Sequence, residues 1–157
     1  MTLEYAGYAG QQIKQADVNL LGYPLGVVTD RGLLLRDLAY YDAKIDRVNG
    51  PAMAFSVFCV QYAWLGDAAK AEEMFRRCYR PNLRPPFGLL AETPTSHNPY
   101  FTTCAGGMLQ AVMNGFGGLE ITDKGIVCRE TALPASWKRL TIKGVGPERR
   151  TYVINNP

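Results

Sequence analysis

The residues of this 157-residue chain that could do chemistry gather in three short polar segments, each placed just ahead of an apolar run. The first segment, QQIKQAD, carries Lys14, Gln15 and Asp17. An ammonium group only donates hydrogen bonds, whereas an amide both donates and accepts, so Lys14 and Gln15 together could hold two neighbouring hydroxyl groups. The structural alternative is that Lys14 extends to solvent, that Gln15 caps a helix, and that Asp17 caps a helix or pairs with Lys14.

The second segment, YYDAKIDRVNGP, carries Asp42 and Asp46, and the third, LLAETPTSHNPYFTT, carries Glu92 and His97, the single histidine of the chain. Carboxylates and an imidazole are the usual general acids and bases of enzymes. Asp42 could equally be a solvated carboxylate at the end of a helix, and His97 a plain loop residue. The sequence alone leaves both alternatives open.

The middle of the chain predicts two helices joined by a minimal turn. Residues 52–65 are apolar on all sides after Pro51, which is typical of a helix that is buried all round. Gly66 suits the left-handed position that ends this helix, and Asp67 suits the N-cap of the next one. Apolar residues recur at helical spacing from Ala68 to Cys78, while two Glu–Arg pairs spaced i,i+4 occupy the opposite face.

The alternation of buried and amphipathic helices extends to both sides of this pair. IKQADVNLLGY predicts a short, mostly buried helix, DRGLLLRDLAYYDA an amphipathic one, and TTCAGGMLQAVMNGF a buried one in which Gly106 and Gly107 permit close helix contact. Successive hairpins of a double-layered α/α toroid produce this order. A helical-repeat solenoid is the second possibility, although the sequence has no repeating period.

A toroid would bring the three polar segments together. Its inner helices run parallel, so that their N-termini and the loops before them lie on one face, where the helix dipoles add partial positive charge. We therefore expect Lys14, Gln15, Asp42 and Glu92 to lie on one face of the molecule, at the beginnings of the buried helices.

After Gly117 the pattern changes to strands. GLEITDKGIVCRE predicts a hairpin that turns at Asp123-Lys124-Gly125, and WKRLTIKGVG and RRTYVINN predict two more strands. We expect a helical region over residues 1–117 and a small antiparallel β region over residues 118–157. Since a few strands are marginally stable alone, they should pack on the helices or on a part of the protein outside this chain.

Composition and spacing argue against several classes of function. The net charge is +3 with scattered basic residues, which argues against nucleic-acid binding. The chain shows no signal peptide, and its longest apolar run is too short to span a membrane, so we expect a cytoplasmic protein. The four cysteines form no CxxC pair, and no metal site or cofactor is expected. Trp64 and Trp137 are expected to serve packing.

Three stretches resemble a known family. IKQADVNLLGYPL, GPAMAFSVF and GGMLQAVMNGFGGLEIT are similar to the end of the catalytic domain in glycoside hydrolase family 65, and most closely to its glucosylgalactoside glucosidase branch. The resemblance covers about Glu4 to Leu140. It implies a mainly α fold made of the last helical hairpins of an (α/α)6 barrel, followed by a small antiparallel β-sheet region. The chain would then be a C-terminal piece of the enzyme.

The resemblance also implies roles for particular residues. Lys14 and Gln15 match the pair that holds glucose, while the general acid is a glutamate farther upstream than Glu4. The general base corresponds by position to Asp42, where the family commonly has glutamate, with Asp46 and Glu92 as reserves. His97 and Glu92 are further candidates for contacting sugar.

The predicted activity is hydrolysis with inversion of a terminal glucose from an α-1,2-type glucosyl-galactoside or a similar disaccharide, although the chain alone should be inactive without the acid. GPAMAF replaces the serine-rich phosphate loop of the family's phosphorylases, which favours hydrolysis over the alternative of a disaccharide phosphorylase. A non-catalytic helical-hairpin interaction module is the other alternative. The expected partners are an α-glucoside and, at an exposed edge near Leu20, Leu21 and Tyr23, the rest of the barrel or a second copy of the chain.

Overall fold

A computed structural model describes residues 1–15, 17–98 and 100–156. The fold is mainly helical, with small antiparallel sheets, as the sequence predicted. The helices are η1 (Asp17–Leu21), α1 (Arg31–Asp42), α2 (Ala52–Trp64), α3 (Ala68–Tyr79), η2 (Arg80–Asn82), α4 (Thr102–Gln110) and η3 (Ala111–Phe116). The strands are β1 (Leu83–Arg84), β2 (Leu89–Leu90), β3 (Leu119–Thr122), β4 (Gly125–Cys128), β5 (Arg139–Val145) and β6 (Arg150–Asn155).

Helix α2 forms the centre of the molecule. Ten of its thirteen residues are buried, which confirms the prediction of a helix that is apolar on every side. It packs against η1, α3, α4 and η3. The apolar side chains that it shares with these neighbours make up most of the single core cluster.

Aspartate side chains cap the beginnings of α3 and α1. As the sequence predicted, the side chain of Asp67 accepts a hydrogen bond from the backbone N–H of Lys70 at the start of α3. Asp30, which was not predicted to cap a helix, does the same for Leu33 at the start of α1. Gly66 has a φ of +84°, the left-handed conformation that the turn between α2 and α3 requires. Both predicted Glu–Arg pairs of α3 are formed.

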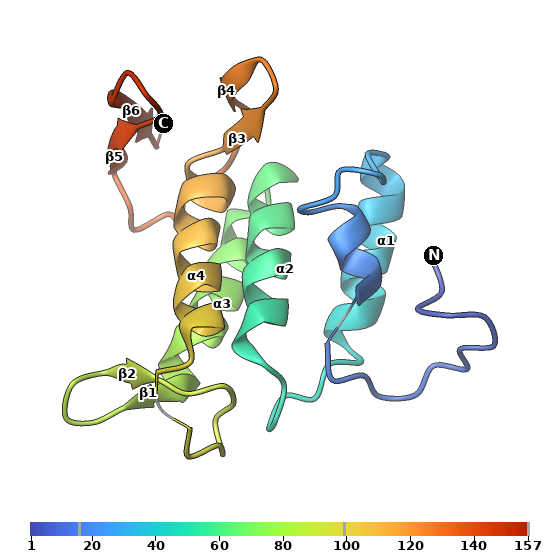
Figure 1. The fold of residues 1–157 in the computed structure, drawn as a ribbon. Coiled ribbons are helices and arrows are strands. Elements are labelled where there is room, and N and C mark those ends of the chain that lie inside the picture. Colours follow the sequence, from blue (N-terminus) through green and yellow to red (C-terminus); the bar gives the residue numbers. More distant parts are fainter. Residues whose placement is uncertain (16, 99, 157) are drawn as a thin grey trace.

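Figure 1 shows that α2 and α4 run in the same direction, from the lower to the upper side of the view, whereas α1 and α3 run in the opposite direction. Helices that alternate in direction along the chain are what the hairpin pattern predicted. The first of these elements is shorter than expected: instead of an α-helix, the IKQADVNLLGY stretch forms the five-residue 3-10 helix η1. Backbone contacts of Ile13 with Lys44 and Asp46 hold the preceding residues in an extended bridge.

The packing of α2 on α4 depends on one of the two adjacent glycines. A Cβ atom on Gly107 would lie 2.6 Å from the Ser56 hydroxyl oxygen, whereas a Cβ atom on Gly106 would meet open space. The close approach continues into η3, a π-helical segment that prolongs α4, where Gly115 lies against the backbone of Val60. Small residues therefore set the distance between the two parallel helices.

The β region consists of separate two-stranded antiparallel sheets, β3–β4 and β5–β6, and it packs on the helices as expected. Trp137 carries much of this contact, because its ring lies 5.0 Å from that of Phe116 and 5.9 Å from that of Phe75. Trp64 also has a packing role, with its indole N–H donating to the Asn114 carbonyl. The short pair β1–β2 was not predicted. No helix of the described residues combines the length and apolar character needed to cross a bilayer.

The glycine pair yields a matched stability prediction. Gly107→Ala should lower the free energy of unfolding by about 1–3 kcal/mol, because the methyl group overpacks the contact with Ser56. Gly106→Ala should leave stability unchanged or raise it by up to about 1 kcal/mol, because alanine restricts the unfolded chain and meets open space. Urea unfolding followed by circular dichroism measures both, and equal effects of the two substitutions would contradict the packing of α2 on α4.

Candidate functional site

The three polar segments meet at the lower end of the helices in Figure 1, and we call the described residues of 11–17, 43–51 and 91–101 the polar loops. The backbone N–H of Asp46 donates to the Ile13 carbonyl, which joins the first polar loop to the second. The Thr95 hydroxyl donates to Asn49 Oδ1 over 2.6 Å, which joins the second to the third. The predicted convergence of the loops is therefore present in the structure.

Lys14 and Glu92 are the predicted site residues that the structure brings together. The Lys14 ammonium lies 3.4 Å from Glu92 Oε1, and Asn98 Nδ2 lies 3.5 Å from Glu92 Oε2. Both contacts are long, and the side chains of Lys14 and Glu92 are 66% and 32% exposed. The carboxylate is thus open to solvent and is loosely held by a cation and an amide, two groups that can also bind hydroxyls.

The backbone of Glu92 is held more firmly than its side chain. Its carbonyl accepts hydrogen bonds from the side-chain amide of Asn82 over 3.1 Å and from the N–H of Ala52 over 3.4 Å. Ala52 is the first residue of α2, which has no side-chain cap. Glu92 is therefore anchored to the beginning of the central helix, and only its carboxylate is free to turn toward a ligand.

Gln15 lies next to this pair but bonds elsewhere. Its side-chain amide donates to Asp17 over 3.3 Å. Asp17 pairs with Gln15 rather than with Lys14, and the N-terminus of η1 is capped instead by Glu4, whose carboxylate accepts from the N–H groups of Asp17 and Val18. The sequence did not predict this distant cap, because Asp17 lies thirteen positions after Glu4.

The structure places Asp42 in a different cluster of charges. One carboxylate oxygen lies 3.0 Å from Arg47 and the other 3.6 Å from Lys70, while the side chain is only 10% exposed. Arg47 and Lys70 also contact Glu73, so that the cluster joins the end of α1 to α3. A hydrogen bond to Glu73, with Asp42 also nearby, raises the pKa of Lys70. Both oxygens of Asp42 are therefore engaged by cations, and neither contacts Lys14.

Asp46 lies in the polar loops but is committed to their backbone. Its Oδ1 accepts from the N–H groups of Val48 and Asn49 over 2.8 and 2.9 Å. These bonds, that of Asn49 first, hold the pKa of the Asp46 carboxyl below its usual value. A carboxylate that is stabilised in this way is a weak base.

His97 is exposed in the third polar loop and makes none of the hydrogen bonds found among the described residues. Asn49, Thr95 and Asn98 were missed as site residues. Their type carries no special signal in a loop, and only the folded chain shows that they join the loops to one another and to Glu92.

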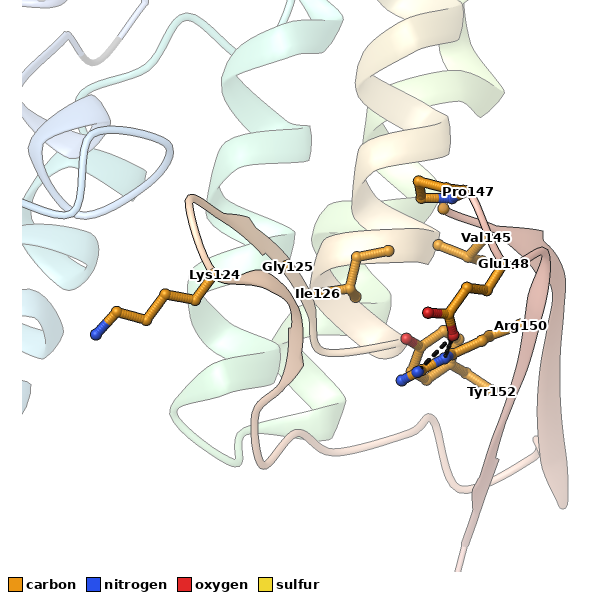
Figure 2. Close-up of a pocket in the computed structure, with 9 residues that line it drawn as sticks. Lys124, Gly125, Ile126, Val145, Pro147, Glu148, Arg150 and Tyr152 are labelled. Carbon is orange, nitrogen blue, oxygen red and sulfur yellow. Dashed lines mark hydrogen bonds and ion pairs between the residues drawn. The ribbon is translucent and has the colours of Figure 1, made fainter.

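Among the surface hollows of the described residues, two lie at opposite ends of the helices. One, of about 300 Å³, lies in the polar loops and is lined by Gln12, Ile13, Lys14, Asp46 and Asn49. The other, of about 320 Å³, lies between the tips of the β3–β4 and β5–β6 hairpins (Figure 2). The only carboxylate among the residues lining this second hollow, Glu148, is paired with Arg150 over 2.6 Å. The hollow in the polar loops is the one that contains predicted site residues.

Known proteins with similar sequences support the resemblance stated above. A kojibiose hydrolase of Mucilaginibacter mallensis is 49% identical over 98% of this chain, and one of Flavobacterium johnsoniae is 46% identical over 99% of it. A protein-glucosylgalactosylhydroxylysine glucosidase of Dictyostelium discoideum is 41% identical over 75% of the chain. The chain spans only 23%, 23% and 16% of the lengths of these relatives, and no family model matches it.

The charge cluster around Asp42 yields a prediction that separates structural from catalytic roles. Asp42→Asn should lower the free energy of unfolding by about 1–2 kcal/mol, because Arg47 and Lys70 lose a largely buried partner while remaining partly solvated themselves. The control, Glu72→Gln, removes an exposed i,i+4 pair with Arg76 and should cost no more than about 0.5 kcal/mol. Thermal unfolding of the variants provides the comparison, and an Asp42→Asn protein as stable as the wild type would contradict a structural role.

Proposed function

We propose that this chain, a relative of the glucosidases of glycoside hydrolase family 65, contributes to the hydrolysis of an α-glucoside. Its matches to these relatives are consistent with a C-terminal piece of such an enzyme. The substrate that we propose is a disaccharide unit with a terminal glucose in an α-1,2-type linkage. In support, two relatives are named for the hydrolysis of kojibiose and one is named a glucosylgalactosylhydroxylysine glucosidase. The observation that carries this proposal is the Lys14–Glu92 pair, which lies open to solvent where the polar loops meet.

We propose Glu92 rather than Asp42 as the general base. In an inverting reaction the base removes a proton from the water that attacks the anomeric carbon, so its carboxylate must be reachable by water. Asp42 has both oxygens in ion pairs, and the backbone bonds of Asp46 make it a weak base. Glu92 is partly exposed and anchored through its backbone, which leaves its carboxylate free to accept a proton.

Lys14 and Gln15 are proposed to hold the hydroxyl groups of the glucose unit. The Lys14 ammonium is exposed and Gln15 is half-buried beside it in the sequence. The bond from Gln15 to Asp17 is long enough, at 3.3 Å, to be exchanged for a ligand hydroxyl. The general acid is proposed to be a glutamate outside this chain. Glu4, the only glutamate before Lys14, is occupied as the cap of η1.

Two other functions are less well supported. A phosphorylase would need donors for a phosphate at the beginning of α2, where this chain has Pro51, Ala52 and Met53, which lack polar side chains. A pure interaction module would not require a lysine and a carboxylate to meet across seventy-eight residues of sequence. The cytoplasm stays our proposed compartment, since all four cysteines are free, although relatives of this chain include yeast acid trehalases named as periplasmic.

The helices are proposed to be the last hairpins of an (α/α)6 barrel, with residues 1–117 in the barrel and 118–157 in a β domain. Apolar side chains are exposed on α1 and the loop before it, namely Leu25, Val27 and Leu35, and on α4 and η3, namely Leu109 and Met113; we call these two groups the exposed flanks. Tyr23, expected at this edge, is instead buried against Trp64, and Leu20 and Leu21 are half-buried. The exposed flanks are where we propose that the remainder of a barrel, or a second copy of the chain, would pack.

The site assignment predicts which residues respond to a glucose analogue. Titration with the glucose-like amine 1-deoxynojirimycin should shift the amide NMR signals of Lys14, Gln15 and Glu92. Loss of one charged contact is worth about 1.5–3 kcal/mol, so Lys14→Ala and Glu92→Gln should each weaken binding about 10–100-fold. Asp42→Asn is the control and should bind the analogue like the wild type. If only Asp42→Asn lost binding, the site would have to be assigned to Asp42 instead.

A further prediction concerns turnover. An inverting site needs two carboxyl groups about 6.5–9.5 Å apart, one on each side of the bond, and this chain supplies the base alone. The purified chain should therefore release no glucose from kojibiose above the rate of a Glu92→Gln control in a coupled glucose assay. Release that disappears in Glu4→Gln would show that the acid lies within this chain.

The exposed flanks predict association. The chain should sediment as a dimer or larger species at micromolar concentrations, because covering the flanks removes apolar surface from water at about 25 cal/mol per Å². Leu25→Ser together with Val27→Ser should shift the distribution toward monomer. The matched change of exposed β-hairpin residues, Ile121→Ser with Val127→Ser, should leave it unchanged, and a wild-type monomer at all concentrations would contradict the proposal.

A further inference from the structure

Arg84, a residue of strand β1, donates hydrogen bonds to the carbonyl groups of five residues. Its Nη2 atom donates to the carbonyls of Thr93 over 3.0 Å, Pro94 over 2.7 Å and Ser96 over 3.2 Å. Its Nη1 atom donates to the carbonyls of Pro81 and Leu83, both over 3.1 Å. One guanidinium thus ties the β1 segment to the stretch that directly follows Glu92.

The chemistry of the guanidinium makes this contact unusually restrictive. Its donors lie in one plane at fixed angles, so that carbonyls that bind the same group are held in fixed positions relative to one another. The half-buried Arg84 forms none of the salt bridges found in the described part of the chain. Its charge is therefore directed at backbone carbonyls and not at a competing carboxylate.

The carbonyls that Arg84 contacts in this stretch belong to Thr93, Pro94 and Ser96, between Glu92 and its neighbour Asn98 in the third polar loop. Within it, the N–H of Thr93 donates to the Ser96 hydroxyl, and the N–H of Ser96 donates to the Thr93 hydroxyl. On the other side of Glu92, Ala91 donates to the carbonyl of Asn82, whose side chain in turn donates to the Glu92 carbonyl. Arg84 anchors the side of Glu92 that these Asn82 contacts do not reach.

We propose that Arg84 is a positioning residue, which sets the location of the Glu92 carboxylate and of Asn98 relative to Lys14 by fixing the carbonyls of Thr93, Pro94 and Ser96. This inference rests on the function proposed for Glu92. Arg84 does not itself contact the sugar, but a misplacement of a reacting group by about 1 Å can cost about 100-fold in rate. The effect of Arg84 should therefore be visible in the properties of Glu92.

The test compares two ligands that differ in charge. A cationic glucose analogue such as 1-deoxynojirimycin gains affinity from a well-placed carboxylate, whereas neutral glucose gains less. We expect Arg84→Ala to reduce the preference for the cation over glucose by about 10-fold in calorimetric titrations, in the same direction as Glu92→Gln. Arg84→Lys should recover only part of the preference, because one ammonium cannot span three carbonyls. Arg80→Ala, which removes an exposed charge four residues away, is the matched control and should keep the wild-type preference.

Amide hydrogen exchange provides a second measurement that does not depend on the ligand. In Arg84→Ala, or in Arg84→Lys if the alanine variant does not fold, the N–H of Ser96 should exchange at least about 10-fold faster while the N–H groups within α2 stay protected. Unchanged exchange at Ser96, or an unchanged ligand preference in Arg84→Ala, would overturn the positioning role. A third outcome is that Ser96 exchanges faster in the Arg84 variant but the wild-type protein binds neither ligand. That outcome would overturn the proposed function of Glu92 and leave Arg84 as an anchor of the loop only.

Discussion

The burial of α2 on every side is the constraint on which the rest of the structure depends. A helix with so little polar surface must be surrounded, and it is enclosed by η1, α3, α4 and η3. The contact with α4 requires two backbones to approach closely, which Gly107 and Gly115 allow. Once α2 and α4 lie parallel, their N-termini point to the same side, and the loops that precede them must meet there.

Crowding of the loops determines which polar groups are available for chemistry. The beginning of α2 has no side-chain cap, so that the Glu92 carbonyl and the loop around it close over that end of the helix. Asp46 and Glu4 are taken up by backbone N–H groups, and Asp42 by Arg47 and Lys70. Glu92 stays partly exposed beside Lys14 because its structural role falls on its backbone. Stability and candidate function are thus divided between two parts of one residue.

The sequence predicted those features that follow from local patterns. The boundaries of α1, α2 and α3, the Asp67 cap, the Gly66 turn and the hairpin at Asp123-Lys124 each depend on residues close together in the chain. The resemblance identified Lys14, and the polar character of the loops identified Glu92. Neither could separate Glu92 from Asp42, because the difference lies in partners distant in sequence, such as Lys70 for Asp42. The extended bridge between Ile13 and Ile45 likewise explains why η1 is shorter than its apolar pattern suggested.

The two hairpins at the far end of the helices have a practical consequence. The turn at Asp123-Lys124 and the one between Val145 and Arg150 project from the end of the molecule opposite to the polar loops, as Figure 1 shows. A fluorophore or an affinity tag inserted at either turn would report on the folded state without touching the groups that face a ligand. Because of the same separation, the length and sequence of these two turns can change during evolution while the polar loops stay the same.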